Sequence, residues 1–350
     1  MQEALLPFLR CPVTGSSLRL QVISKTVKQF HTGPQEILSE GILWAGLDWF
    51  YPIIGGIPRL LVESFEDHAD FLAKYIPDFY ARRQVLYDKY GPLIRQVIRK
   101  NKRTKKSFHQ EWSLYNYAGD KTWNADKEGM MQRFLQETDE TLLSIRGKLI
   151  FDAGCGNGLL NSLLAGAGTT VIGMDFSRSI EQAFAHNLEP RAHFIQGDVR
   201  YPPVKERIFD IVQCSGVLIH TPNTREAFYC IEPCVKSGGK LSVWLYHPRK
   251  DLIHNTINQI RRLTSRLPMR LQYYLYRLTL LPVSFVIKRL KGNKQNLREM
   301  MIDILDWFSP EYRWEHEHQE VEGWFERGNY ISVKTTTNEL FGFNMTGVKK

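Results

Sequence analysis

The stretch Leu149–Leu160, which reads LIFDAGCGNGLL, decides the fold. An apolar strand is expected to end at Asp152, and three glycines alternate before an apolar helix: Gly154, Gly156 and Gly158. Glycine at these positions allows a tight turn and lets a ligand approach the backbone amides at a helix N-terminus. The dinucleotide fingerprint needs glycine at 159, where this chain has Leu159, and the Asp152 carboxylate would repel a pyrophosphate. A ligand with a cationic group suits this loop better.

Two further acids follow at the ends of the next two expected strands. Asp175 ends the apolar VIGMD, where a carboxylate can accept hydrogen bonds from two ribose hydroxyls. Asp198 follows FIQG, in a position to meet the edge of an adenine ring. Each acid alone has a simpler interpretation as a cap at a strand–helix turn. Together with the glycine loop, in this order and spacing, they favour a nucleoside site.

From residue 147 the chain alternates short apolar strands with helical patterns. The expected strands are Lys148–Asp152, Thr170–Asp175, His193–Gln196, Phe209–Cys214 and Lys240–Tyr246. This rhythm predicts an α/β fold with an open parallel sheet and helices on both faces. Near the C-terminus, Tyr330–Thr336 and Leu340–Val348 are expected to pair as an antiparallel hairpin that completes the sheet.

These motifs resemble the class I S-adenosylmethionine-dependent methyltransferases, which have a Rossmann-like fold, across roughly 147–247. The matching pieces are D-x-G-x-G-x-G, the ribose acid, FDIVQCSGVLIHT and VKSGGKLSVWLY, in which Ser237 stands where the family has proline. The resemblance implies that S-adenosylmethionine is the cofactor. It assigns the methionine part to Asp152 and the glycines, the ribose to Asp175, and the adenine to Asp198 and Val199. It implies further cofactor contacts from Phe176, Ser215 and Trp112.

The sequence gives less specific signals for the residues that act on the methyl acceptor. His220 follows the fourth strand, at the edge where open α/β sheets bind ligands, and is the first candidate for a base. A core or capping histidine is an equal alternative. Similar methyltransferases carry a pattern matched here by Ser309, Tyr312, His316, His318 and Trp324, so Tyr312, His316 and His318 are further catalytic candidates. No metal site is expected.

The first 62 residues resemble a second family, the small zinc-ribbon-like activators of RNA and release-factor methyltransferases. That family holds zinc with two cysteine pairs. Here Cys11 remains, Thr14 stands at the second position, and residues 37–60 contain no cysteine. One cysteine cannot supply four ligands, so a metal-free β-rich module is expected.

The chain has 350 residues and a net charge of +9. Between His247 and Met300 there are twelve basic and two acidic residues, so this segment carries +10. The expected division is a β-rich module over 1–62, a helical linker over 63–146, the cofactor-binding core over 147–247, a basic helical lid over 248–308, and a C-terminal helix and hairpin over 309–350. The lid segment interleaves apolar residues with arginines. It fits a cover over an acceptor pocket, with Arg261, Arg262 and Arg266 best placed to hold an acidic group. It equally fits an amphipathic helix on anionic lipid.

Composition excludes several classes of protein. With 43% hydrophobic and 24% charged residues the chain is neither disordered nor fibrous. No apolar run is long enough for a bilayer span, no signal peptide is apparent, and five cysteines give no disulfide framework, so a cytoplasmic protein is expected. The leading function is methyl transfer to a small-molecule or lipid-like acceptor. An RNA or protein methyltransferase is the alternative, although no known RNA-binding motif appears. A non-enzymatic adenosylmethionine-binding protein and a nicotinamide oxidoreductase follow.

Overall fold

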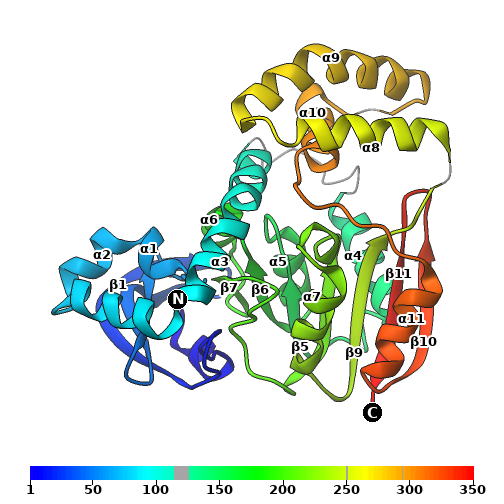
Figure 1. The fold of residues 1–350 in the computed structure, drawn as a ribbon. Helices are drawn as coiled ribbons and strands as arrows, with labels where there is room; N and C mark the ends of the chain where they lie inside the picture. The colour runs from blue at the N-terminus through cyan, green and yellow to red at the C-terminus, as the bar shows by residue number, and fades with distance from the viewer. Residues whose placement is uncertain (114–125, 250, 294) are drawn as a thin grey trace.

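A computed structural model describes residues 1–113, 126–249, 251–293 and 295–350. Its centre is a seven-stranded sheet in the order β10-β11-β9-β8-β5-β6-β7 (Figure 1). The five strands of the parallel part are β5 (Leu149–Ala153), β6 (Thr170–Asp175), β7 (Ala192–Gln196), β8 (Phe209–Ser215) and β9 (Val235–Tyr246). An antiparallel hairpin extends the β9 edge through β11 (Gly342–Lys349) and β10 (Tyr330–Asn338). The predicted fold class is confirmed.

Helices connect the strands of the parallel part. Short apolar segments follow the strands and form α5 (Leu159–Gly166), α6 (Ser179–His186) and α7 (Thr224–Ile231). The remaining elements here are α4 (Lys127–Thr138) before β5, the 3-10 turns η2 (Leu218–His220) and η3 (Glu232–Cys234), and α11 (His318–Arg327) before the hairpin. Asn223 caps α7 by accepting a hydrogen bond from the Glu226 amide at 3.2 Å. These crossovers place every parallel strand end at one edge of the sheet.

The N-terminal module is a separate antiparallel sheet, preceded by the turn η1 (Glu3–Phe8). Its strands are β1 (Leu18–Phe30), β2 (Gly33–Ala45), β3 (Trp49–Ile54) and β4 (Ile57–Pro58). The residues after β4 join the central sheet, because Arg59 forms a parallel bridge with Gln196 and the Leu60 amide donates to the Gln196 carbonyl at 2.8 Å. The module therefore covers the β7 edge of the central sheet.

The β1–β2 hairpin is long, since each of its strands has 13 residues. Residues 24–36 are mostly polar and show no alternating apolar pattern, yet residues 25–30 pair with residues 33–38 around the turn at His31 and Thr32. Backbone hydrogen bonds hold this part of the ladder, while most of its side chains face solvent. Its end docks on the central domain, since the His31 amide donates to the Leu188 carbonyl at 2.9 Å.

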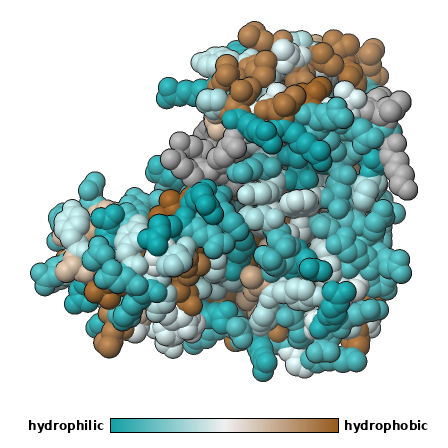
Figure 2. All heavy atoms as spheres, in the orientation of Figure 1, coloured by the Kyte–Doolittle hydropathy of each residue, from teal (hydrophilic) through white to brown (hydrophobic). Residues whose placement is uncertain are grey.

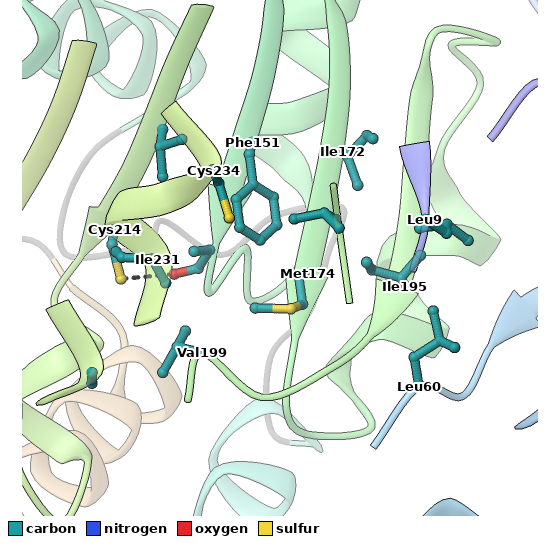
Figure 3. Close-up of a cluster of buried hydrophobic side chains, with 14 of the residues drawn as sticks. Leu9, Leu60, Phe151, Ile172, Met174, Ile195, Val199, Cys214, Ile231 and Cys234 are labelled. Atoms are coloured by element: carbon teal, nitrogen blue, oxygen red, sulfur yellow. Dashed lines mark hydrogen bonds between the residues drawn. The ribbon is translucent and has the colours of Figure 1, made fainter. Parts of the chain in front are cut away.

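One hydrophobic core runs through both sheets. Figure 3 shows Leu9 and Leu60 of the N-terminal module beside Ile172 and Ile195 of the central strands. All four side chains are at most 1% exposed. Burying a leucine contributes roughly 1.5–3 kcal/mol, so the module and the parallel sheet stabilise each other.

Three helices follow the module: α1 (Ser64–Asp67), α2 (Ala69–Tyr75) and α3 (Phe79–Ser113). Proline is disfavoured inside a helix, but α3 continues through Pro92. Proline removes one helical hydrogen bond at a cost of about 3 kcal/mol. Burial of Leu86, Ile94 and Val97 on the two sides of Pro92 offsets this cost, because all three belong to the main core.

The basic segment forms a helical layer above the carboxyl ends of the parallel strands (Figure 1). It consists of α8 (Leu252–Thr264), α9 (Met269–Leu290) and α10 (Leu297–Phe308). Helix α10 begins with a capping box between Asn296 and Glu299. The segment was expected to be helical, and it is. None of the described helices is long and apolar enough to span a bilayer.

Cys11 takes part in packing within the N-terminal module. Its sulfur lies 3.2 Å from the Tyr51 hydroxyl and accepts a hydrogen bond from the Thr14 amide at 3.4 Å. Within the described ranges, no three His, Cys, Asp or Glu side chains are grouped so that they could hold a metal ion.

Candidate functional site

A cavity lies at the carboxyl edge of the parallel sheet. It holds about 840 Å³ of space, part of it open to solvent. Its walls come from the loops after β5, β6, β7 and β8, from the turn η2, and from helices α3 and α10. The lining residues are Lys100, Asn101, Gly154, Gly156, Met174, Asp175, Phe176, Gly197, Asp198, Val199, Arg200, Ser215, Gly216, Val217, His220, Thr221, Pro222 and Asp306. Eight of the residues singled out from the sequence therefore meet in one place.

Asp175 is held in position by the glycine loop and its own turn. One carboxylate oxygen accepts from the Gly156 amide at 3.0 Å, and the other accepts from the amide and the hydroxyl of Ser177, both at 2.8 Å. Burial raises the pKa of the Asp175 carboxyl, and these donors oppose the rise. The carboxylate has about four acceptor positions, and these donors fill three of them. The Ser177 hydroxyl can donate to the Ser179 hydroxyl at 2.8 Å instead, so up to two positions are available toward the cavity.

The three glycines have different roles. Gly154 has φ +110° and lines the cavity, and a Cβ there would lie 2.2 Å from Cγ2 of Val217. Gly156 also lines the cavity. Gly158 lies outside it, at the N-cap of α5, where a Cβ would lie 2.6 Å from Ala183 and from Phe194. This third glycine serves close packing of the helix onto the core.

Asp152 also lies outside the lining, buried beneath the loop at the end of β5. Burial, reinforced by the like charges of Asp175 and Glu137, raises the pKa of its carboxyl to about 7. Glu137, at the end of α4, is paired with Arg133 at 2.7 Å and accepts from the side-chain Nε2 of Gln213 at 3.0 Å. The floor of the site thus holds a buried acid that lacks a cationic partner among the described residues, and a neighbouring acid that has one.

This burial has a consequence for stability. An unfolded aspartate has a pKa near 3.9, so the folded protein holds a proton on Asp152 between about pH 4 and pH 7 that the unfolded chain has released. The stability that depends on a protonated Asp152 is fully present below about pH 4 and is lost as the pH rises through about 7. Asparagine does not titrate, so Asp152→Asn should gain stability relative to wild type as the pH rises. We expect the free energy of unfolding of the variant minus that of wild type to be larger at pH 8 than at pH 4, by an amount on the order of 2–4 kcal/mol.

Urea unfolding of wild type and variant at pH 4, 6 and 8 checks this prediction. A stability gap between Asp152→Asn and wild type that is the same at all three pH values would contradict the assigned cause.

Asp198 is part of a network that spans two regions of the chain. Its carboxylate is paired with Arg200 at 2.6 Å and accepts from the Asn101 side chain at 3.3 Å. Asn101 comes from α3, where it also donates to Glu63 at 3.1 Å. The negative charge of Asp198 is therefore balanced, and the network ties α3 to the loop after β7. The apolar side chains of Val199 and Phe176 line the cavity beside it.

His220 lies on the turn after β8, where its side chain is 5% exposed. Its Nδ1 lies 2.9 Å from the Tyr312 carbonyl oxygen. A carbonyl can only accept, so Nδ1 carries the proton and Nε2 carries the lone pair in the neutral ring. Burial lowers the pKa of His220 to about 4, which keeps the ring neutral at physiological pH. Tyr312 itself is absent from the lining and acts here through its backbone.

The remaining candidates lie elsewhere. Nδ1 of His316 donates to Glu320 at 3.0 Å, and the His318 ring stacks on Phe343 with centroids 3.8 Å apart. His318 thus holds α11 against β11, whereas the His316 side chain contacts residues of α11 itself, and neither histidine lines the cavity. The backbone of Trp112 belongs to α3, but its side chain lies outside the described residues.

The structure adds lining residues that the sequence did not suggest: Lys100, Asn101, Arg200 and Asp306. Asp303 and Asp306 interrupt the otherwise apolar run from Met300 to Phe308 in α10, and this was the one available signal. Of the arginines expected to face an acceptor, Arg261 is buried and donates to the Pro310 carbonyl at 2.9 Å, while Arg262 and Arg266 are exposed. Within the described part of the basic segment, the lining comes from α10 and not from these arginines.

Comparison with known proteins supports the interpretation of this region. Residues 151–243 match the family described as methyltransferase domain. Ubiquinone biosynthesis O-methyltransferase of Coxiella burnetii is 31% identical over 105 residues, which are 29% of this chain and 45% of that protein. The enzyme of the same name from Bordetella bronchiseptica is 34% identical over 107 residues, 29% of this chain and 43% of that protein. The chain thus spans less than half the length of these relatives.

Solved structures with a similar fold include two methyltransferases. One is magnesium protoporphyrin IX methyltransferase from Synechocystis PCC 6803 with bound SAH, with a TM-score of 0.41, 17% identity, and coverage of 71% of this chain and 98% of that one. The other is human N-acetylserotonin methyltransferase in complex with SAM, with a TM-score of 0.42, 14% identity, and coverage of 72% and 58%. The family match does not reach the N-terminal module, whose resemblance to the zinc-ribbon-like activators finds no support in these comparisons. The match of residues 151–243 to the methyltransferase domain family agrees with the glycine loop and the acids at the strand ends, which predicted such a domain in this part of the chain.

Proposed function

We propose that this protein transfers a methyl group from S-adenosylmethionine to an oxygen, nitrogen or sulfur atom of a small-molecule or lipid-like acceptor. The observation that carries the proposal is the cavity itself. It places the ribose-type acid Asp175 and the loop glycine Gly154 in one chamber with the neutral imidazole of His220. A methyl donor and an acceptor thereby have access to the same space.

The donor set suits S-adenosylmethionine. The spare lone pairs of Asp175 fit two ribose hydroxyls, and Phe176 and Val199 offer apolar surface to an adenine ring. The buried Asp152 carboxyl, with its raised pKa, would gain from a cationic group above the loop, as the methionine amino group provides. When bound, the cofactor supplies a methyl group on a positively charged sulfur. A nicotinamide dinucleotide fits less well, because its pyrophosphate would lie against these acids.

His220 can receive the proton that an oxygen or nitrogen acceptor loses as it is methylated. The bond from Nδ1 to the Tyr312 carbonyl fixes the tautomer and leaves Nε2 as the acceptor. A pKa of about 4 makes His220 a weak base but keeps it unprotonated, so it also adds no positive charge beside a sulfonium. Asp306 on the opposite helix is a second polar group able to orient the acceptor.

The size of the cavity favours a small acceptor over a macromolecule. Helices α3 and α10 line two of its sides through Asn101 and Asp306, so that the cavity is walled by several elements and only partly open to solvent. The relatives named as ubiquinone biosynthesis O-methyltransferases are consistent with an acceptor of this kind. The alternative of an RNA or protein acceptor rests on the positive charge of residues 247–300.

We expect His220→Asn to lower kcat about 10- to 100-fold while leaving S-adenosylmethionine affinity unchanged, because loss of general-base help has effects of about this size or larger. The asparagine amide nitrogen can keep the bond to the Tyr312 carbonyl, so the variant removes Nε2 alone. Calorimetry measures the affinity, and initial rates on the identified acceptor measure kcat. His193→Asn is the matched control, since burial also lowers the pKa of His193 to about 4 but His193 lies outside the cavity. Equal rates for wild type and His220→Asn would contradict the role.

The function as a whole is tested with methyl-labelled S-adenosylmethionine. The protein is incubated with separate lipid, small-metabolite, RNA and protein fractions, and label transfer is followed together with S-adenosylhomocysteine release. Label in the lipid or metabolite fraction supports the proposal. Label confined to RNA or protein would favour the alternative acceptor class, and failure of the folded protein to bind S-adenosylmethionine would refute the methyl-transfer function.

A further inference from the structure

The outer surface of the helical layer exposes many large apolar side chains. On α9, Leu271, Tyr274, Leu278 and Phe285 follow one another at spacings of three, four and seven residues, so they share one face of the helix. Leu278 is 77% exposed and Leu290 is 83% exposed. The α8–α9 face also includes Ile260, Leu263, Val283, Val286, Ile287 and Leu290. Figure 2 shows hydrophobic residues gathered over α9 at the top of the molecule.

The helices α8 and α9 are also strongly basic. Residues 252–291 contain eight Lys or Arg and no Asp or Glu. Among the described residues, seven of these basic side chains have no acidic partner within 4.0 Å; Arg261 and Arg289 bond backbone carbonyls instead, and the other five are Arg262, Arg266, Arg270, Arg277 and Lys291. Only Lys288 is paired, with Asp303 at 2.5 Å. Water is an unfavourable environment for the exposed apolar side chains, and the protein offers these cations no acidic partner. A surface of this kind is typical of an interaction site.

We propose that the α8–α9 face docks the protein onto an anionic lipid bilayer, with the apolar side chains of α9 among the headgroups and the arginines on lipid phosphates. Helices of this composition lie in the interface plane, and their binding combines buried apolar area with attraction to anionic lipid. Since none of the described helices could span the bilayer, the contact is peripheral.

Two other occupants fit these observations less well. A second copy of the chain would bring two faces of the same charge together, because each carries eight basic residues and no acid over 252–291. An RNA would engage the arginines through phosphates but would leave residues such as Leu278 and Leu290 without an apolar partner. A bilayer satisfies the charges and the apolar side chains together.

The α8–α9 face lies close to the cavity, so docking on a bilayer would bring the candidate site near the lipid. Helix α9 packs on α10, where the Tyr276 hydroxyl donates to the Phe308 carbonyl at 3.3 Å and the two rings lie 5.7 Å apart. Asp306, two residues before Phe308, lines the cavity. One helix therefore separates the proposed lipid contact from the candidate site, so an acceptor dissolved in the bilayer would have a short path to it. The docking itself does not depend on the proposed methyl transfer.

Vesicle co-sedimentation of the full chain, without any methyl donor, tests the proposal. We expect binding to phosphatidylcholine vesicles with about 30% phosphatidylglycerol to be at least about tenfold tighter than to pure phosphatidylcholine, and to weaken between about 0.1 and 0.5 M salt. The variant Leu278→Glu/Leu290→Glu should lose about tenfold in affinity for anionic vesicles. So should Arg266→Gln/Arg270→Gln/Arg277→Gln.

Leu47→Glu is the matched control, because Leu47 is 91% exposed but belongs to the N-terminal module, and its vesicle binding should equal that of wild type. Circular dichroism confirms that each variant is folded. Equal binding by the Leu278→Glu/Leu290→Glu variant and wild type would overturn the proposal. So would a dimer that dissociates in this variant in light scattering, or tRNA binding that weakens in the arginine variant while vesicles are not bound. Because no methyl donor is present, failure here leaves the proposed methyl transfer to its own test.

Discussion

Replacing Asp175 with asparagine is expected to weaken S-adenosylmethionine binding about 100-fold. A hydrogen bond to a charged group contributes about 1.5–3 kcal/mol, and the two proposed ribose bonds would lose their charge assistance together. The variant also turns an amide toward the turn, where one carboxylate oxygen now accepts from the Gly156 amide at 3.0 Å. The expected loss is therefore about 3 kcal/mol in calorimetry, which corresponds to about two decades in Kd.

A second acid on a strand provides a control that distinguishes an effect on cofactor binding from an effect on folding. Asp210 on β8 also accepts a backbone hydrogen bond, from the Leu149 amide at 2.8 Å, but it lies outside the cavity. Asp210→Asn should cost stability and leave S-adenosylmethionine affinity near that of wild type. If the Asp175→Asn protein is folded and binds as tightly as wild type, the assignment of Asp175 to the ribose is wrong.

The cofactor side of the site was predictable because it is local in sequence. Each acid follows an apolar strand directly, and parallel strands bring their carboxyl ends to one edge of the sheet. Five strands in register therefore place Gly154 beside Asp175 and Asp198 once the order of the strands is known. The hairpin at the C-terminus was equally visible, because its two segments carry their own strand patterns.

The parts that escaped prediction depend on contacts between distant segments. Asn101 and Asp306 reach the cavity from helices that precede and follow the matched domain, and nothing in their neighbouring residues indicates where those helices pack. The polar half of the β1–β2 hairpin is held by its backbone ladder, which leaves little pattern in the side chains. His316 and His318 were chosen on a family pattern, but stacking and pairing with nearby side chains explain their positions.

Gly154→Ala should have the largest effect of any single methyl group added to this protein. The residue has φ +110°, where an L side chain is strained, and the new Cβ would lie 2.2 Å from Cγ2 of Val217. The loop cannot easily shift, since the Gly154 amide donates to the Met174 carbonyl at 2.7 Å. Strain of about 1–3 kcal/mol and overpacking of similar size add together. We expect a loss of about 2–5 kcal/mol in unfolding free energy and at least about 100-fold in S-adenosylmethionine affinity.

Gly238→Ala separates strain from crowding. Gly238 also has a positive φ, +75°, but nothing lies within 4 Å of a Cβ added there, and it is outside the cavity. This variant should cost about 1 kcal/mol of stability and leave cofactor affinity unchanged. Adding Val217→Ala to Gly154→Ala removes the closest contact and should recover part of the lost stability, while the strained φ remains. Gly154→Ala and Gly238→Ala could instead behave alike in urea unfolding and calorimetry. In that case the close contact between residue 154 and Val217 would not determine the shape of the cavity, and Gly154 would be needed only for the conformation of its turn.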